Sequence, residues 1–243
     1  LYGVHFGLNS VFQNNLMLLD KVKKCIASYS GRNLTLAGKA TIINSVICAQ
    51  LWYVGQCITL PETLARLINK QLFRFLWGNK IECVARNTVI RDREIGGLGV
   101  THIVAKLDSF RCNHIYKFLT APYASWHDFA AYWIGQQLRH YRPEYAVNQR
   151  PHAEIPNQFY GTALSIFYLL RDIKPRFVIS DLVARKSYKT ISGLVSKQPG
   201  VIDKFPHINF EHTWKELNSK FISPRPRELC WRIAHHVLPV NAY

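Results

Sequence analysis

The sequence predicts a mainly α-helical fold that begins with a three-helix bundle. Apolar residues recur at three- and four-residue steps over most of the chain, which is the period of amphipathic helices. Residues 11–30, 35–54 and 61–75 each carry one apolar stripe, and the connections between them are short. One buried stripe per helix with short connections is typical of a small helical bundle.

The first helix is expected over residues 11–30, after a short strand. Residues 1–8 alternate glycine with apolar and aromatic residues, which favours an edge strand. The apolar stripe of the helix consists of Phe12, Leu16, Leu19, Val22, Ile26 and Tyr29. Gly31 follows as the expected C-terminal cap.

The second and third helices have clear start signals. Thr35 can cap the second helix by accepting from a first-turn N–H group. Pro61 and Glu62 are favoured in the first turn of the third. The expected buried residues are Leu36, Ala40, Ile43, Ile47, Leu51 and Val54 in the second helix, and Leu64, Leu67, Ile68, Leu72 and Phe75 in the third.

The pattern changes after residue 79. Short alternating runs lead to Gly-Gly-Leu-Gly at 96–99, which allows a small hairpin or a long ordered loop. Further helices are expected at 102–120, 125–139, 159–171, 187–197, 210–221 and 225–237.

Charge gives the first indication of function. Lysine and arginine number 31 against 15 acidic residues, a net charge of +16 that is spread over the whole chain. A broad positive field attracts polyanions, foremost nucleic acid. Six scattered cysteines without a CxxC pair favour a reduced intracellular setting, in the cytoplasm and nucleus. The uncharged stretch 41–60 contains too many polar residues for a membrane span, so no membrane is expected as a partner.

No catalytic residue and no metal site is expected. Residues 31–41, "GRNLTLAGKAT", have the wrong spacing for a P-loop, and Ala40 stands where the hydroxyl residue belongs. Asp92 and Glu94 alternate with arginines, which indicates local neutralisation instead of a two-metal centre. Cysteines and histidines lie close together in the sequence at two places, but neither place has the four ligands of a structural zinc site. The two groups are Cys112 with His102 and His114, and Cys230 with His235 and His236. Buried thiols and surface histidines explain these sets better.

A basic cluster is the candidate site. The residues expected to bind nucleic acid are Lys21, Lys23, Lys24, Arg32, Lys39, Lys70 and Arg74. Five of them surround the end of the first helix and the start of the second, where free N–H groups also attract anions. A merely solvated basic face is the alternative. Trp52, Tyr53 and Trp77 could stack on bases, although core packing is favoured for them.

Four motifs in order resemble the region after the reverse transcriptase core of non-LTR (LINE-type) retrotransposon polyproteins. They are "YGVHFG" (2–7), "SYSGRNLTLAGKATIINSVICAQLWYV" (28–54), "LPETLARLINKQLFRFLWG" (60–78) and "GGLGV" (96–100). The resemblance implies that Tyr2 and Gly3 match the primer-grip strand, and that Gly38 and Lys39 match the Gly-Arg pair of the polymerase thumb.

The resemblance also implies a division of the chain. Residues 1–8 would be the last strand of the polymerase palm, residues 9–100 a thumb-like helical bundle with a Gly-rich loop, and residues 101–243 a helical connector. The chain would be a non-catalytic fragment of an RNA-directed DNA polymerase with an endonuclease, and would grip an RNA/DNA template-primer. The magnesium of the polymerase would lie outside it, and a zinc-binding segment would follow its C-terminus. A helical module that binds the rest of the polyprotein without contacting nucleic acid is the alternative.

Overall fold

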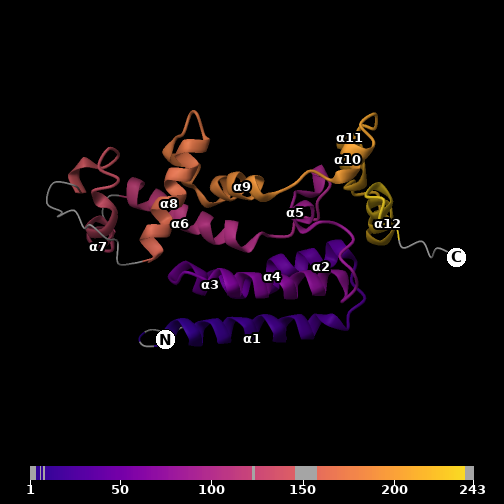
Figure 1. Cartoon of the computed structure of the whole chain (residues 1–243), viewed down its shortest axis with the longest axis horizontal. Coiled ribbons are helices and arrows are strands. Elements are labelled where there is room, and N and C mark those ends of the chain that lie inside the picture. The colour runs from indigo at the N-terminus through magenta and orange to yellow at the C-terminus, as the bar shows by residue number, and fades with distance from the viewer. Residues whose placement is uncertain (1–3, 6, 8, 122–123, 146–157, 239–243) are drawn as a thin grey trace. The chain divides into compact units, whose positions relative to one another are not determined.

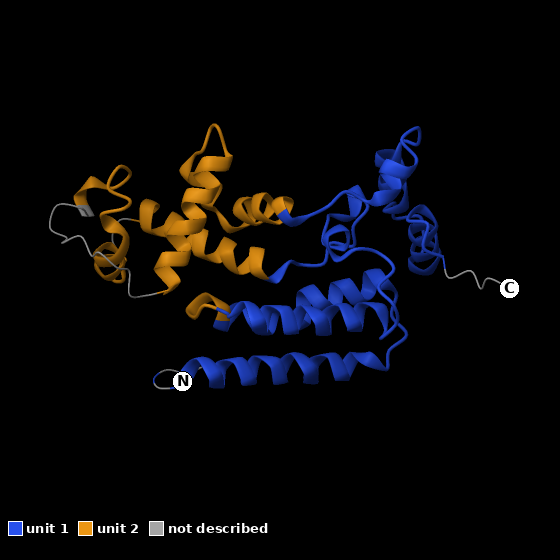
Figure 2. Cartoon of the chain, in the orientation of Figure 1, with its two compact units in different colours: residues 1–54, 60–103, 195–243 blue, residues 55–59, 104–194 orange. Residues whose placement is uncertain are grey.

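The computed structural model describes residues 4–5, 7, 9–121, 124–145 and 158–238, and these residues are mainly α-helical, as predicted (Figure 1). They form two compact units (Figure 2). Unit 1 comprises residues 1–54, 60–103 and 195–243, and unit 2 comprises residues 55–59 and 104–194. The C-terminal 49 residues cluster with unit 1 and not with residues 104–194.

Helix α1 (Ser10–Ser30) packs against α4 (Glu62–Trp77) with a face that shares Val22 with the predicted stripe but is otherwise shifted from it. Its buried residues are Asn14, Leu18 and Val22, which follow one another at four-residue steps. Phe12 and Leu16 of the predicted stripe are 64% and 54% exposed. The helix carries apolar residues on two faces, and packing against α4 selects one of them.

The expected N-terminal strand is not found, since no described residue belongs to a β-strand. The buried side chain of Asn14 instead provides the hydrogen bonds that a strand partner would make. The His5 N–H group donates to Asn14 Oδ1 at 2.9 Å, and Asn14 Nδ2 donates to the His5 carbonyl at 2.9 Å. Tyr2 and Gly3, the predicted primer-grip residues, lie outside the described residues.

The predicted second helix is α2 (Leu36–Ile42), the π-helical turn η1 (Ile43–Ile47) and α3 (Ala49–Cys57). All six residues of its predicted stripe are buried. The π-helical turn carries Asn44, whose Nδ2 donates to the Gly99 carbonyl at 2.7 Å while its Oδ1 accepts from the Thr101 N–H group at 2.9 Å. In α4 the predicted stripe is buried except for Leu67, which is half exposed.

Of the two structures expected for residues 80–100, a small hairpin or a long ordered loop, the structure shows an ordered loop without a hairpin. This segment forms α5 (Arg86–Val89) and a 3₁₀ turn, η2 (Arg93–Ile95). Gly96 follows with φ of 91°, a conformation that favours glycine. A Cβ atom on Gly97 would lie 1.9 Å from the Arg91 carbonyl oxygen. The glycines therefore allow a tight loop. The alternating sequence of this segment resembles that of a hairpin, although the segment forms a loop.

The C-terminal helices of unit 1 are α10 (Gly200–Lys204), α11 (Phe210–Leu217) and α12 (Pro224–Ala234). Helix α11 packs on η2 and on α12, and α12 also contacts α2. A side chain of α12 and one directly after this helix both donate a hydrogen bond to the Gly96 carbonyl oxygen. Trp231 Nε1 donates to it at 3.1 Å and His235 Nε2 at 2.8 Å. The C-terminal segment is thus part of the core of unit 1.

Unit 2 is built around a buried cluster of apolar and aromatic side chains. Its elements are α6 (Ile103–Thr120), α7 (His127–Ala130), η3 (Ala131–Gly135), η4 (Pro143–Tyr145), α8 (Gln158–Ile173), η5 (Ile179–Leu182) and α9 (Ala184–Val195). His114 of α6 lies against Trp126, with ring centroids 4.6 Å apart. Within the described part of the chain, no helix has the length and apolar character needed to cross a membrane.

Replacing Gly97 by alanine should destabilise unit 1. The added Cβ atom would collide with the Arg91 backbone, which cannot move aside as a flexible side chain would. We expect a loss of about 1 to 3 kcal/mol in the free energy of unfolding, measured by urea denaturation. Gly200→Ala is the matched control, because no atom lies within 4 Å of its added Cβ. Equal stability of the two variants would contradict the structure of the loop.

The imidazole of His114 should make unit 2 sensitive to acid. Burial, together with the nearby charges of Lys117 and His127, lowers the pKa of His114 to about 4. The unfolded chain, with a histidine pKa near 6.5, binds the proton first, so stability is lost as the pH falls from about 6.5 to 4. His114→Phe should remove about 1 to 3 kcal/mol of this dependence in unfolding experiments across that range. A stability difference between the two proteins that stays constant with pH would contradict the assignment.

Candidate nucleic-acid interface

All seven basic residues predicted to bind nucleic acid lie in unit 1. Six of them are exposed: Lys21, Lys23 and Lys24 on α1, Arg32 in the following loop, and Lys70 and Arg74 on α4. Lys24 is paired with Asp20 at 2.8 Å, with both side chains largely exposed. Such a pair contributes little to stability. The guanidinium of Arg32 lies over the ring of Tyr29, 4.5 Å from its centroid.

Two of the seven residues line the same hollow, although they are 35 positions apart in sequence. This hollow, here called the Lys39 hollow, has a volume of about 160 Å³. It lies where α1 and α4 end and α2 runs past them. Its lining residues are Ile26, Ser30, Lys39, Gln71, Arg74, Phe75, Gly78 and Asn79. The structure therefore brings Lys39 and Arg74 together, from two different helices.

Lys39 differs from the other six because its side chain is half-buried. Its ammonium group lies 5.9 Å from the centroid of the Phe75 ring. Burial lowers the pKa of Lys39, the carboxylate of Glu228 opposes that shift, and the charges of Arg232 and Lys80 add to it. The environment of Lys39 is thus partly shielded from water and contains charges of both signs.

The start of α2 was expected to offer free N–H groups to an anion. In the structure, two of these N–H groups already donate to oxygen atoms of the protein. Thr35 caps the helix as predicted, since its hydroxyl oxygen accepts from the Gly38 N–H group at 3.2 Å. Glu228 of α12 places Oε2 at 2.8 Å from the nitrogen of Leu36. The other carboxylate oxygen, Oε1, accepts from Arg232 at 2.7 Å. A carboxylate of the protein therefore takes the position proposed for a phosphate.

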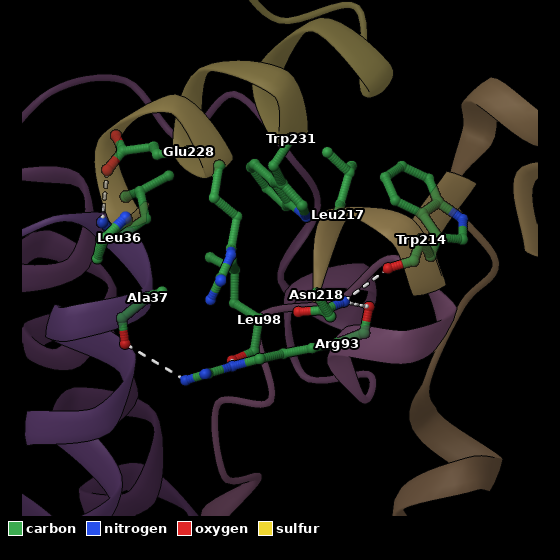
Figure 3. A pocket seen from close by; sticks show the side chains of 12 residues that line it. Leu36, Ala37, Arg93, Leu98, Trp214, Leu217, Asn218, Glu228 and Trp231 are labelled. Atoms are coloured by element: carbon green, nitrogen blue, oxygen red, sulfur yellow. Dashed lines mark hydrogen bonds between the residues drawn. The ribbon is translucent and has the colours of Figure 1, made fainter. Parts of the chain in front are cut away.

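Figure 3 shows how α12 and α11 enclose this region. Glu228, Trp231, Leu36 and Leu98 line a small cavity of about 30 Å³, with Glu228 directly beside Leu36. On its other side, Arg93 Nη2 donates to the Ala37 carbonyl at 3.4 Å, and Asn218 Nδ2 donates to the Arg93 carbonyl at 2.9 Å. The arginines beside Asp92 and Glu94 were expected to neutralise these carboxylates. Arg93 instead forms hydrogen bonds with α2 and with the residue that follows α11. The cavity is a packed junction and leaves little room for a ligand.

A shallower hollow of about 300 Å³ lies beside Glu228, between the start of α2 and α12. Arg225 and Arg232 line it together with Asn33 and Thr35. These arginines were not predicted, because only the fold brings them beside the first two helices. Glu228, 192 positions from its partner Leu36, was missed for the same reason. Neither position carries a local signal in the sequence.

The aromatic and thiol candidates mostly belong to the core. Trp77 is buried, Trp52 is half-buried and Tyr53 is exposed, which favours core packing for the tryptophans. Burial raises the pKa of Cys112 to about 12, so this thiol stays protonated at neutral pH. His235 was expected at the surface but is buried. Burial lowers the pKa of His235, while its hydrogen bond to the Gly96 carbonyl has the opposite, smaller effect.

Removing the charge of Glu228 should weaken unit 1. Glu228→Gln loses the carboxylate at the N-terminus of α2 and the ion pair with Arg232, both at a side chain that is 20% exposed. We expect a loss of about 1 kcal/mol in the free energy of unfolding. Glu216→Gln on α11, where the side chain is 67% exposed, should change it by less than about 0.5 kcal/mol. Equal losses would show that Glu228 has no special role.

Comparison with known proteins gives one informative similarity. No protein-family model matches the chain. A stretch of 119 residues, 48% of the chain, is 29% identical to the Transposon TX1 uncharacterized 149 kDa protein of Xenopus laevis. The match spans 9% of the length of that protein. This similarity supports a retrotransposon-derived chain.

Proposed function

We propose that the chain is the thumb and following connector of a retrotransposon reverse transcriptase, and that unit 1 binds the phosphate backbone of an RNA/DNA hybrid. Three findings support the proposal. The sequence motifs occur in the order found in such proteins, part of the chain is similar to a transposon protein, and the fold is helical. The chain itself would bind without catalysing, as one part of a polymerase that acts in the cytoplasm and nucleus.

The observation that carries the proposal is the gathering of basic side chains in unit 1. Helices α1 and α4 pack together, and each presents exposed lysine or arginine at several positions. Lys39 and Arg74 add a shared hollow to this surface. Lysine and arginine contacts to phosphates supply most of the affinity of sequence-independent binding. Such contacts suit a polymerase thumb, which has to bind any sequence.

A second function is favoured by a separate observation on α1. Val11, Phe12 and Leu16 are all more than half exposed near the start of this helix. Exposed apolar side chains that lie close together often mark protein interaction sites. Unit 1 would then be a helical module that binds another part of the same polyprotein.

Salt titration distinguishes the two functions. The affinity for an RNA/DNA hybrid should fall steeply as salt rises, because each phosphate contact releases counterions. Lys21→Glu combined with Lys23→Glu should weaken binding and lower the slope of log affinity against log salt by about two. Fluorescence anisotropy with a labelled hybrid measures both quantities.

The control is Lys215→Glu combined with Lys220→Glu, at two exposed positions of unit 1 that make the same change in net charge. It should leave the slope unchanged. A flat salt response of the original chain, or equal effects of the two double variants, would reject the proposed function.

A further inference from the structure

We propose that the Lys39 hollow is a binding site for a single phosphate group, held between the ammonium of Lys39 and the guanidinium of Arg74. The source of the phosphate, a phosphodiester of a nucleic-acid backbone, rests on the proposed function. The existence of the site does not, because it follows from the groups that line the hollow.

The first argument is convergence of charge. Lys39 comes from α2 and Arg74 from the last turn of α4, and both line a hollow of about 160 Å³. The lining contains no aspartate or glutamate. Within the described part of the chain, neither Lys39 nor Arg74 has a carboxylate oxygen within 4 Å of its charged nitrogens. Two cations thus line one hollow that has no carboxylate in its lining, while the charge of Glu228 acts on Lys39 from outside the hollow.

The second argument is the remaining lining. Gln71 and Asn79 also line the hollow, and the NH₂ group of a side-chain amide can donate to phosphate oxygens. Ser30 already donates its hydroxyl hydrogen to the Ile26 carbonyl at 2.7 Å. Two charged and two neutral donor groups therefore surround the space, a combination suited to an oxyanion.

The third argument is the free-energy cost of holding the charged Lys39 side chain in a half-buried position. Burial of Lys39 disfavours its charged form and lowers its pKa, an effect that the charges of Arg232 and Lys80 increase and that the carboxylate of Glu228 opposes. A bound phosphate would compensate this charge. Without a ligand, an apolar side chain of similar length would fill the same space over Phe75 at lower cost.

Lys39 could instead serve the fold by neutralising the end of α4. Gly78 ends this helix in a left-handed conformation, and a Cβ atom on Gly78 would lie 3.3 Å from Lys39 Nζ. A lysine near a helix C-terminus stabilises it. This role predicts that Lys39→Met lowers the melting temperature, whereas the phosphate site predicts an unchanged or raised melting temperature and weaker binding.

The test uses the complete chain with the RNA/DNA hybrid. Lys39→Met and Arg74→Met should each weaken binding at low salt by roughly tenfold. Because both side chains hold the same phosphate, the double variant should lower the salt slope by about one. Lys21→Met combined with Lys70→Met, on separate helices, is the matched control and should lower it by about two. A fall of two in the Lys39/Arg74 double variant would overturn the shared site.

Inorganic phosphate provides a readout that does not depend on nucleic acid. The lysines are labelled by reductive ¹³C-methylation, and the Lys39 signal is identified by its loss in Lys39→Arg. Adding phosphate should shift the Lys39 signal, while the exposed Lys215 stays unchanged and sodium chloride of equal ionic strength has no effect.

The two readouts separate the two proposals. A phosphate-induced shift of Lys39 without any binding of the hybrid would reject the proposed function and retain the phosphate site. Steep, salt-dependent binding of the hybrid, with no shift of Lys39 and no effect of the double variant, would reject the site and retain the proposed function.

Discussion

Unit 1 depends on the carbonyl oxygen of Gly96, which accepts hydrogen bonds from both Trp231 and His235. A Cβ atom at Gly96 would lie 2.8 Å from the ring of Trp214, so the two C-terminal helices pack directly on this glycine. The same contacts bring Glu228 to the first N–H group of α2. A segment more than 100 residues along the chain therefore completes the bundle that the first helices begin.

This arrangement determines which cations of the basic surface remain available. At the start of α2 the carboxylate of Glu228 serves as the anion, and Arg232 is engaged with it. Lys39, one turn further along α2, points instead to the end of α4 and meets Arg74. The fold thus pairs the cation at the start of α2 with a carboxylate, whereas Lys39 and Arg74 form no ion pair with a described carboxylate.

The sequence predicts the elements of this fold better than their contacts. The six apolar residues of α2, η1 and α3 are buried as expected because they lie on one face, whereas α1 has apolar residues on two faces and only packing chooses between them. Between residues 80 and 100 the glycines at 96, 97 and 99 close a tight loop, so the alternating pattern there does not lead to a hairpin. Lys39 and Arg74 were found as basic residues, but their shared hollow depends on how α2 crosses α4. Glu228 had no sequence signal at all.

The contrast between Glu228 and Lys39 bears on function. A charge that only serves the fold is expected to have partners, and Glu228 has two, at 2.8 and 2.7 Å. Lys39 forms no ion pair with a described carboxylate and shares its hollow with Arg74, and burial disfavours its charged form although the charge of Glu228 opposes this effect. Unfavourable local arrangements that persist in a folded protein are typical of functional sites. Lys39 is accordingly the residue of the basic surface at which stability and binding are expected to change in opposite directions.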